Sequence, residues 1–158
     1  MDEKEYQLEI VEKMARNEDR LNELYVKYAH QFPSRSEFWN GLAREEVGHG
    51  AWIRTLKSRI EDGSVKFGTD RFNVDMINDF YTYVQQQELK INKGMPLISA
   101  LVAAKEIEEL MLEKKFFEVF HGDSLELQTL LLALEYSTKN HRSVVIDAWE
   151  EERKLMSA

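Results

Sequence analysis

Helix-breaking residues are scarce in this chain of 158 residues, and this scarcity limits its fold more than any other feature. The sequence contains only seven glycines and two prolines. Most of them lie where an apolar period of about 3.6 residues also breaks off. A period of this kind, sustained over long intervals, is typical of amphipathic helices and not of strands. The sequence therefore predicts an all-α fold.

Five helices are predicted between these breaks. Ser34 with Glu37, and Asp123 with Glu126, have the form of capping boxes, in which two side chains satisfy free N–H groups at a helix start. The predicted helices run from residue 3 to 31, from Ser34 to Gly63, from an N-cap at Asn73 to Gly94, from 97 to 120, and from Asp123 to 156.

The lengths of the connections predict how these helices are arranged. The short connections around Pro33 and Gly122 require antiparallel neighbours, whereas residues 62–96 are enough to travel the length of a bundle. The result is a four-helix bundle of two helix hairpins, joined by a long crossover that holds an additional helix. This topology is similar to that of ferritin-like proteins. No stretch resembles a linker, so residues 1–158 are expected to form a single domain.

Composition excludes several classes of function. The net charge of -8 disfavours nucleic acid as a partner, because phosphate binding requires clustered Lys and Arg. The longest apolar run, residues 130–134, is too short to span a membrane, and the acidic start does not resemble a signal peptide, so we expect a cytoplasmic protein. Without cysteine, any metal chemistry must use carboxylate and imidazole ligands.

Five polar residues occupy positions that the apolar period assigns to the protein interior. These residues are Glu18, Glu46, His49, Glu108 and His141. A buried carboxylate loses several kcal/mol of hydration, so several of them on facing helices require a cation, a proton or a basic partner. The sequence therefore predicts positive charge at this place, and a metal ion is the first candidate.

The spacing of Glu46 and His49 supports a metal site. Side chains three residues apart lie on one face of a helix, within reach of a common ion. A single pair of this kind is weak evidence. In helix bundles that hold two iron or manganese ions, however, two helices each provide a Glu and two others each provide a Glu-x-x-His pair. This chain offers almost the whole of that set.

An internal repeat indicates which ligand is missing. Glu18 to His49 spans 31 positions and Glu108 to His141 spans 33, so the halves of the chain correspond. Thr138 then stands where the second half should carry a bridging glutamate. The missing charge could be supplied by a hydroxide ion or by one of three acidic residues, Glu45, Glu109 and Glu135. Of these, Glu109 is also a lesser candidate for a metal ligand.

Three glycines lie inside the second predicted helix, at Gly41, Gly48 and Gly50. Glycine costs a helix interior about 1 kcal/mol relative to alanine, so three of them require a physical reason. We interpret them as points of close approach between helices beside the candidate site.

The motifs together resemble the rubrerythrin branch of the ferritin-like superfamily over nearly the whole chain. The residues that carry this resemblance are Asn17-Glu18 with Tyr25, Glu45-Glu46-Val47-Gly48-His49, Glu108 with Phe116, and His141. Tyr25 and Phe116 correspond at a spacing that differs by one residue, which a π-bulge near Glu108 would absorb.

The resemblance implies a di-iron centre that reacts with peroxide or oxygen and receives electrons from an external donor. It implies that Glu18 and Glu108 are terminal ligands, that Glu46 bridges the two ions, and that His49 and His141 bind one ion each. Manganese or zinc are alternatives to iron. Two departures are the lack of a cysteine-ligated rubredoxin domain and the presence of Thr138.

Two other interpretations remain open at this point. In the first, the chain is a degenerate ferritin-like scaffold that holds one metal ion or none and acts as a binding or regulatory module. In the second, it is a structural helical protein whose buried acids pair with Lys and Arg. A homodimer would suit the exposed faces of such a bundle.

Overall fold

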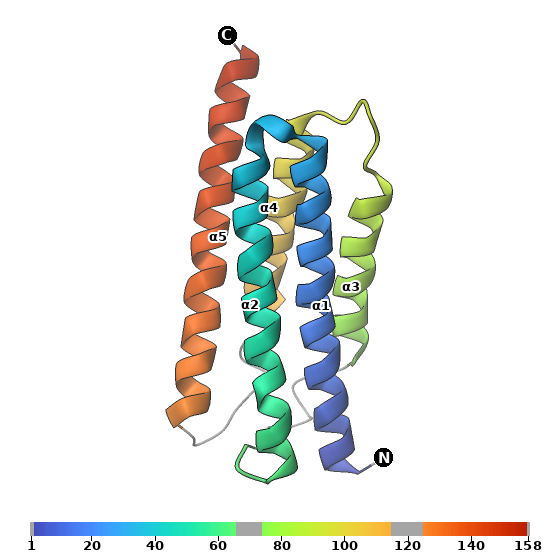
Figure 1. The fold of residues 1–158 in the computed structure, drawn as a ribbon, viewed down its shortest axis with the longest axis vertical. Coiled ribbons are helices and arrows are strands. Elements are labelled where there is room, and N and C mark those ends of the chain that lie inside the picture. Colours follow the sequence, from blue (N-terminus) through green and yellow to red (C-terminus); the bar gives the residue numbers. More distant parts are fainter. Residues whose placement is uncertain (1, 66–73, 115–124, 158) are drawn as a thin grey trace.

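The computed structural model describes residues 2–65, 74–114 and 125–157, and within these ranges it contains helices and no strand (Figure 1). The prediction of an all-α fold is confirmed for this part of the chain. The elements are α1 (Glu3–Gln31), a 3₁₀ turn (Pro33–Arg35), α2 (Ser36–Glu61), α3 (Val74–Leu89), α4 (Leu97–Lys114) and α5 (Leu125–Ser157).

Helix α1 begins and ends where the sequence predicts. The Asp2 side chain caps its start by accepting a hydrogen bond of 2.8 Å from the Glu5 amide. At the other end the Phe32 amide still donates to the Tyr28 carbonyl, and Pro33 then prevents further helix.

The prediction of a capping box at Ser34 is wrong. Helix α2 begins at Ser36, and its N-cap residue, Arg35, makes no side-chain capping bond. Pro33 starts a 3₁₀ turn instead, in which the Arg35 amide donates to the Phe32 carbonyl. Proline suits the first position of such a turn because its φ is preset and it has no N–H to satisfy. The chain therefore reverses through this turn.

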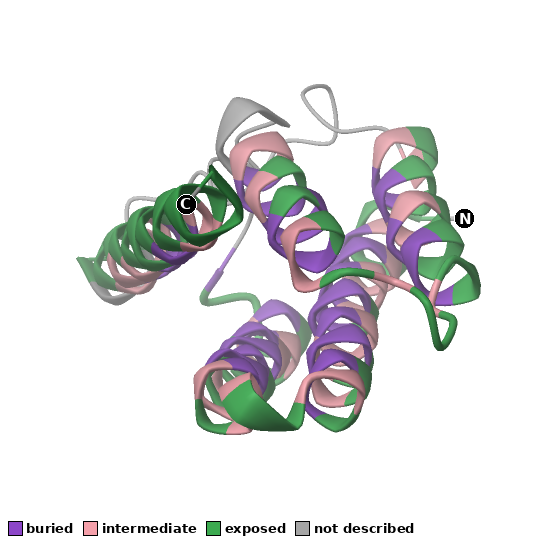
Figure 2. Ribbon diagram, turned by 90° about the horizontal axis from the view of Figure 1, so that it is seen from above, coloured by how far each residue is buried: buried purple, intermediate pink, exposed green. Residues whose placement is uncertain are grey.

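The helices form two antiparallel pairs, α1 with α2 and α4 with α5 (Figure 1). Helix α3 lies within the connection between them, packs against α1 and runs beside it for part of the length of the molecule. Viewed along the axes, the buried residues line the sides of the helices that face one another (Figure 2). The largest buried side chains include Trp39, Tyr25 and Tyr28, whose rings are in mutual contact.

Only one of the three glycines in α2 is a point of close approach. A Cβ atom on Gly50 would lie 3.3 Å from an oxygen of Asp19 on α1. A Cβ atom on Gly41 or on Gly48 would meet nothing within 4 Å, so the interpretation of these two residues is wrong. The apolar period locates glycines on a helix but does not indicate how near the next helix lies.

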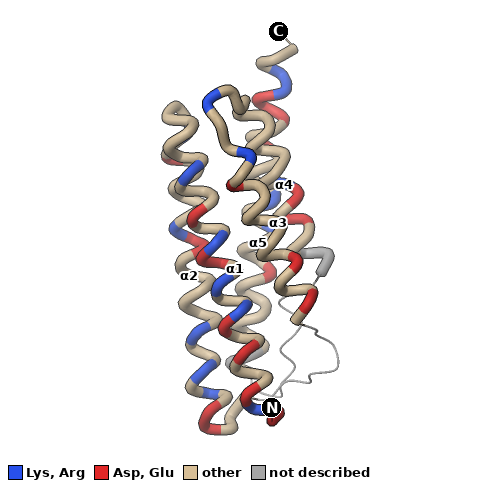
Figure 3. The backbone as a smooth tube through the Cα atoms, turned by 90° about the vertical axis from the view of Figure 1, so that its right-hand side faces the viewer, with Lys and Arg blue, Asp and Glu red and all other residues tan. Residues whose placement is uncertain are grey.

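Basic and acidic residues alternate along α1 and α2 (Figure 3). Arg54 on α2 forms an ion pair with Asp19 at 2.7 Å, and Lys57 forms one with Glu12 at 2.6 Å, so these charges join the two helices on their outer side. No helix within the described ranges has an apolar stretch sufficient to cross a membrane.

Several predictions concern residues outside the described ranges. The N-cap at Asn73, the capping box that begins at Asp123, the continuation of the fourth helix to residue 120, and Phe116 belong to this group. The π-bulge predicted near Glu108 is absent from the described part of α4, which is a continuous α-helix from Leu97 to Lys114.

Candidate metal centre

Four helices provide the five predicted ligands. Glu18 comes from α1, Glu46 and His49 from α2, Glu108 from α4 and His141 from α5. All five side chains are buried, and Glu46 and Glu108 are fully enclosed. The 3.6-residue period places each of them on the inner face of its helix, as the sequence predicts.

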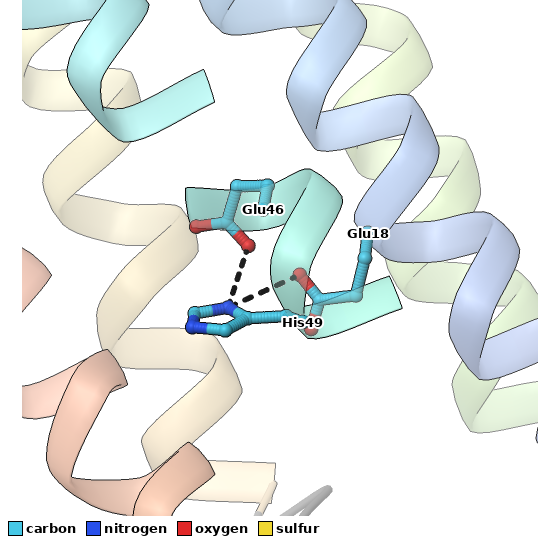
Figure 4. A group of neighbouring side chains, drawn as sticks. All are labelled: Glu18, Glu46 and His49. Atoms are coloured by element: carbon cyan, nitrogen blue, oxygen red, sulfur yellow. Dashed lines mark hydrogen bonds and ion pairs between the residues drawn. The ribbon is translucent and has the colours of Figure 1, made fainter. Parts of the chain in front are cut away.

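Glu18, Glu46 and His49 form one group that could hold a metal ion. Each offers a ligand atom, and these atoms lie within 4.8 Å of one another. His49 Nδ1 lies 3.1 Å from Glu46 Oε2 and 3.9 Å from Glu18 Oε2, so one imidazole nitrogen faces both carboxylates (Figure 4).

Glu46, Glu108 and His141 form a second group with ligand atoms within the same 4.8 Å limit. His141 Nδ1 lies 2.8 Å from Glu46 Oε1 and 3.5 Å from Glu108 Oε1. Glu46 therefore belongs to both groups, with one oxygen turned toward each imidazole. The two rings are stacked with their centroids 5.4 Å apart.

Four buried polar atoms at this centre have no hydrogen-bond partner among the described residues: Glu18 Oε2, Glu46 Oε1, Glu108 Oε2 and His141 Nδ1. Glu46 Oε1 and His141 Nδ1 are close, yet they lack the alignment that a hydrogen bond requires. Native proteins rarely leave buried polar atoms unpaired. Three carboxylate oxygens and one imidazole nitrogen that lack a hydrogen-bond partner in the described part of the chain suit a cation, so the donor set fits metal binding.

The outer nitrogen of each imidazole is held by a residue from the opposite hairpin. His49 Nε2 lies 2.7 Å from the Ser137 hydroxyl on α5. His141 Nε2 contacts the carboxylate of Glu45 on α2. A partner on the outer nitrogen orients the ring and directs the other nitrogen toward a metal. Both Nδ1 atoms accordingly face the carboxylates.

Mutual repulsion and burial shape the charge of the metal-free centre. Burial, together with the neighbouring carboxylates, raises the pKa of Glu18 well above 4.5, and burial also raises the pKa of Glu108. Burial opposes ionisation of Glu46 too, but the neighbouring Glu18 carboxyl and the two nearby imidazoles outweigh it and lower the pKa of Glu46. The centre therefore holds fewer negative charges than it has carboxyl groups.

His141 supplies positive charge when no metal is bound. Burial would lower the pKa of His141, but the nearby Glu108 and Glu46 carboxylates favour the protonated ring and raise it to about 11. A proton on this imidazole thus takes the place of a cation between the two carboxylates. The Tyr25 hydroxyl also stabilises negative charge on Glu108, because it donates a hydrogen bond of 2.8 Å to Glu108 Oε1.

Thr138 does not replace the missing carboxylate. It is buried beside the centre as predicted, but its hydroxyl donates to the Leu134 carbonyl of its own helix at 2.8 Å. The three residues expected to compensate have other partners. Glu109 pairs with Lys105 and Arg142, Glu135 pairs with Lys139, and Glu45 contacts the outer nitrogen of His141.

The buried acids of this centre do not pair with Lys or Arg among the described residues, and their ion pairs are with histidine alone. Glu88 on α3 shows the alternative arrangement, since it is buried and pairs with Arg20 at 2.6 Å and with Lys27 at 3.4 Å. The contrast argues against a purely structural reading of the five residues.

Sequence reasoning missed Ser137 and the contact that Glu45 makes. A signal for both was present in the internal repeat, because Glu45 stands four residues before His49 and Ser137 stands four residues before His141. The repeat makes the two positions equivalent, although glutamate and serine show no chemical likeness.

The resemblance to rubrerythrins depends on short motifs around these ligands. The described structure brings all five predicted ligands together, but a set of neighbouring side chains does not by itself identify a family. Comparisons of the chain with protein-family models, with curated proteins and with solved structures find no match.

Proposed function

We propose that this protein is a ferritin-like, rubrerythrin-type di-metal protein that binds ferrous iron at the centre and reacts with peroxide or oxygen. The observation that carries the proposal is the position of Glu46, which belongs to both Glu/His groups and directs one oxygen toward each imidazole. Such a carboxylate can bridge two ions. One ion would also be bound by Glu18 and His49, and the other by Glu108 and His141.

The chemistry of the donors supports iron or a related divalent metal. Carboxylate oxygen and imidazole nitrogen suit iron, manganese and zinc, and the chain has no cysteine to favour a softer ion. The arrangement of the donors on four helices also agrees with the bundle cores in which di-iron carboxylate sites are built. Two ferrous ions bound there would supply the two electrons that reduce peroxide to water.

The residues of the chain have separate tasks in this proposal. The imidazoles and carboxylates hold the ions, and the burial of all five side chains limits access of water. Tyr25 keeps Glu108 in position through its hydrogen bond. His141 loses its Nδ1 proton when an ion binds, since the same atom cannot hold both. An external donor must return the electrons, because the chain carries no cysteine for a rubredoxin-type iron centre.

Anaerobic titration of the purified protein with ferrous ion tests the proposal directly. We expect two ions per chain and rapid oxidation of the bound iron by added peroxide, followed by absorbance. Glu46→Ala should abolish more binding than Glu18→Ala, because the first residue serves both positions and the second only one. Failure of the unmodified protein to bind ferrous ion would refute the proposal.

A second candidate function is a degenerate scaffold that holds one ion or none and serves as a binding module. The conformation of Thr138 favours it, since the hydroxyl bonds to its own helix and leaves the centre with three carboxylates. Three carboxylates do not neutralise two divalent ions. A stoichiometry of one ion per chain, with slow reaction toward peroxide, would support this candidate over the first.

A further inference from the structure

The two imidazoles of the centre are prepared for metal binding to different degrees. At His141 the outer nitrogen contacts the Glu45 carboxylate, which can only accept a hydrogen bond when ionised. The contact with Glu45 therefore requires a proton on Nε2 of His141. Nδ1 makes no hydrogen bond and faces Glu46 and Glu108. An ion can take the place of the Nδ1 proton without any change at Nε2.

At His49 both ring nitrogens already make hydrogen bonds. One partner is Glu46, which belongs to both groups, and the other is the neutral hydroxyl of Ser137. Nδ1 lies 3.1 Å from Glu46 Oε2 in hydrogen-bond geometry, and Nε2 lies 2.7 Å from the Ser137 hydroxyl. A hydroxyl can donate or accept, so it does not select a tautomer. An ion at this position must break the bond to Glu46, and Ser137 does not hold Nε2 in the protonated form that leaves Nδ1 free.

A carboxylate behind a ligating imidazole also makes that imidazole a stronger donor, whereas a hydroxyl does so less. Glu45 is suited to this role because its side chain is 54% exposed, so its charge remains hydrated while one oxygen reaches the buried His141. Ser137, at the equivalent position of the repeat, brings no charge to His49.

We propose that the two metal positions are unequal and that the group of Glu46, Glu108 and His141 takes the first ion, with Glu45 as the positioning residue that makes it the tighter position. This inference rests on the proposed function, because it assigns an order to the same two positions. It also explains how a centre with three carboxylates holds one ion firmly when charge limits the second.

Calorimetric titration with ferrous ion alone, without oxygen, tests the order. We expect two steps in the unmodified protein, the first tighter. Glu45→Gln should weaken the tighter step by about 10-fold to 100-fold and leave the weaker step unchanged. Ser137→Ala should affect only the weaker step. Glu109→Gln is the matched control, because it removes the same charge from a half-exposed residue paired outside the centre, and it should alter neither step.

A second measurement tests which of the two positions takes the first ion. His49→Ala should keep the tighter step and His141→Ala should keep only the weaker one. If either variant fails to fold, imidazole resonances of the unmodified protein are followed by NMR with less than one equivalent of zinc, and those of His141 should move first. The inference is overturned if those of His49 move first, or if Glu45→Gln weakens the later step or neither step.

The outcomes separate this inference from the proposed function. If the unmodified protein binds no ferrous ion, both are wrong. If it binds two ions with equal affinity and Glu45→Gln changes neither step, the two-ion centre remains and only the order of the positions is overturned.

Discussion

Two tyrosines one helical turn apart on α1 differ in whether the hydroxyl has a partner. Tyr25 donates to Glu108, whereas the Tyr28 hydroxyl is buried with no partner among the described residues. A buried acceptor left without its donor costs about 1–3 kcal/mol, and removal of an unpaired hydroxyl costs little. We expect Tyr25→Phe to lower the free energy of unfolding of the metal-free protein by that amount.

Tyr28→Phe is the matched control, and it should leave the free energy of unfolding unchanged or raise it slightly. Both residues are fully buried in the same aromatic cluster, so the two variants differ mainly in the hydrogen bond. Denaturant unfolding of both variants in the presence of a chelator is the measurement. Equal losses would show that the bond to Glu108 contributes nothing.

Thr138 allows the ligand set to be completed by one substitution. Thr138→Glu would place a fourth carboxylate on the inner face of α5, three residues before His141. We expect more iron per chain and a higher melting temperature with ferrous ion than without it. The metal-free variant should melt below the unmodified protein, because another buried carboxyl group adds repulsion. Unchanged stoichiometry together with no stabilisation by iron would show that this position does not reach the ions.

At the scale of the helix, the glycines of α2 offer a test that is independent of metal. Nothing surrounds the place where a Cβ atom of Gly41 would lie, so Gly41→Ala should stabilise the helix by about 0.5–1 kcal/mol. At Gly50 the new atom would lie 3.3 Å from Asp19, whose oxygens are held by Arg54. We expect Gly50→Ala to lose most or all of that gain.

Thermal unfolding of the two glycine variants checks this difference. An equal rise in melting temperature for both would mean that α1 and α2 move apart at Gly50 at no cost. The comparison matters for the centre, since Gly50 follows His49 directly and lies beside Glu18 in space.

At the scale of the whole molecule, metal-free stability should fall as the pH rises. The pKa values of Glu18 and Glu108 are raised in the folded protein, so the unfolded chain releases these two protons at a lower pH than the folded protein does. The free energy of unfolding therefore decreases as the pH rises above about 4.5. His141 acts in the same direction. Its stabilising contribution is complete below its usual pKa of 6.5 and is lost progressively as the pH approaches 11.

Glu46 acts in the opposite direction, because its pKa is lowered, but its contribution is lost only as the pH falls below about 4.5. We therefore expect the metal-free protein to be more stable near pH 5 than near pH 8. Unfolding by denaturant with a chelator at both values is the measurement. Greater stability at pH 8 would contradict the charge distribution described for the centre.

Added metal should oppose this fall in stability between pH 5 and pH 8. An ion requires deprotonated ligands, so its binding strengthens as the pH rises. A ligand that binds only the folded state at 100 times its dissociation constant stabilises by about 2.7 kcal/mol. The rise in melting temperature on adding ferrous ion should therefore be larger at pH 8 than at pH 5, and Glu46→Gln should reduce it at both.

The helices and the inward position of the candidate ligands followed from the sequence because both depend on local geometry. A period of 3.6 residues decides which side chains share one face of a helix, and this places Glu18, Glu108 and His141 inside without reference to any other helix. The same reasoning predicted the end of α1 at Pro33, where the ring prevents another turn. It failed at Ser34, because a 3₁₀ turn competes with a capping box over the same few residues.

Contacts between helices were decided only by the tertiary structure. The apolar period does not determine how far one helix is displaced along its neighbour or rotated against it, and these two quantities decide which atoms meet. They bring Ser137 to His49 and Glu45 to His141 across the two hairpins. They also leave open space at Gly48 while closing it at Gly50, two residues further along the same helix. The sequence determined which residues face inward, and the displacement and rotation of the helices determined their partners.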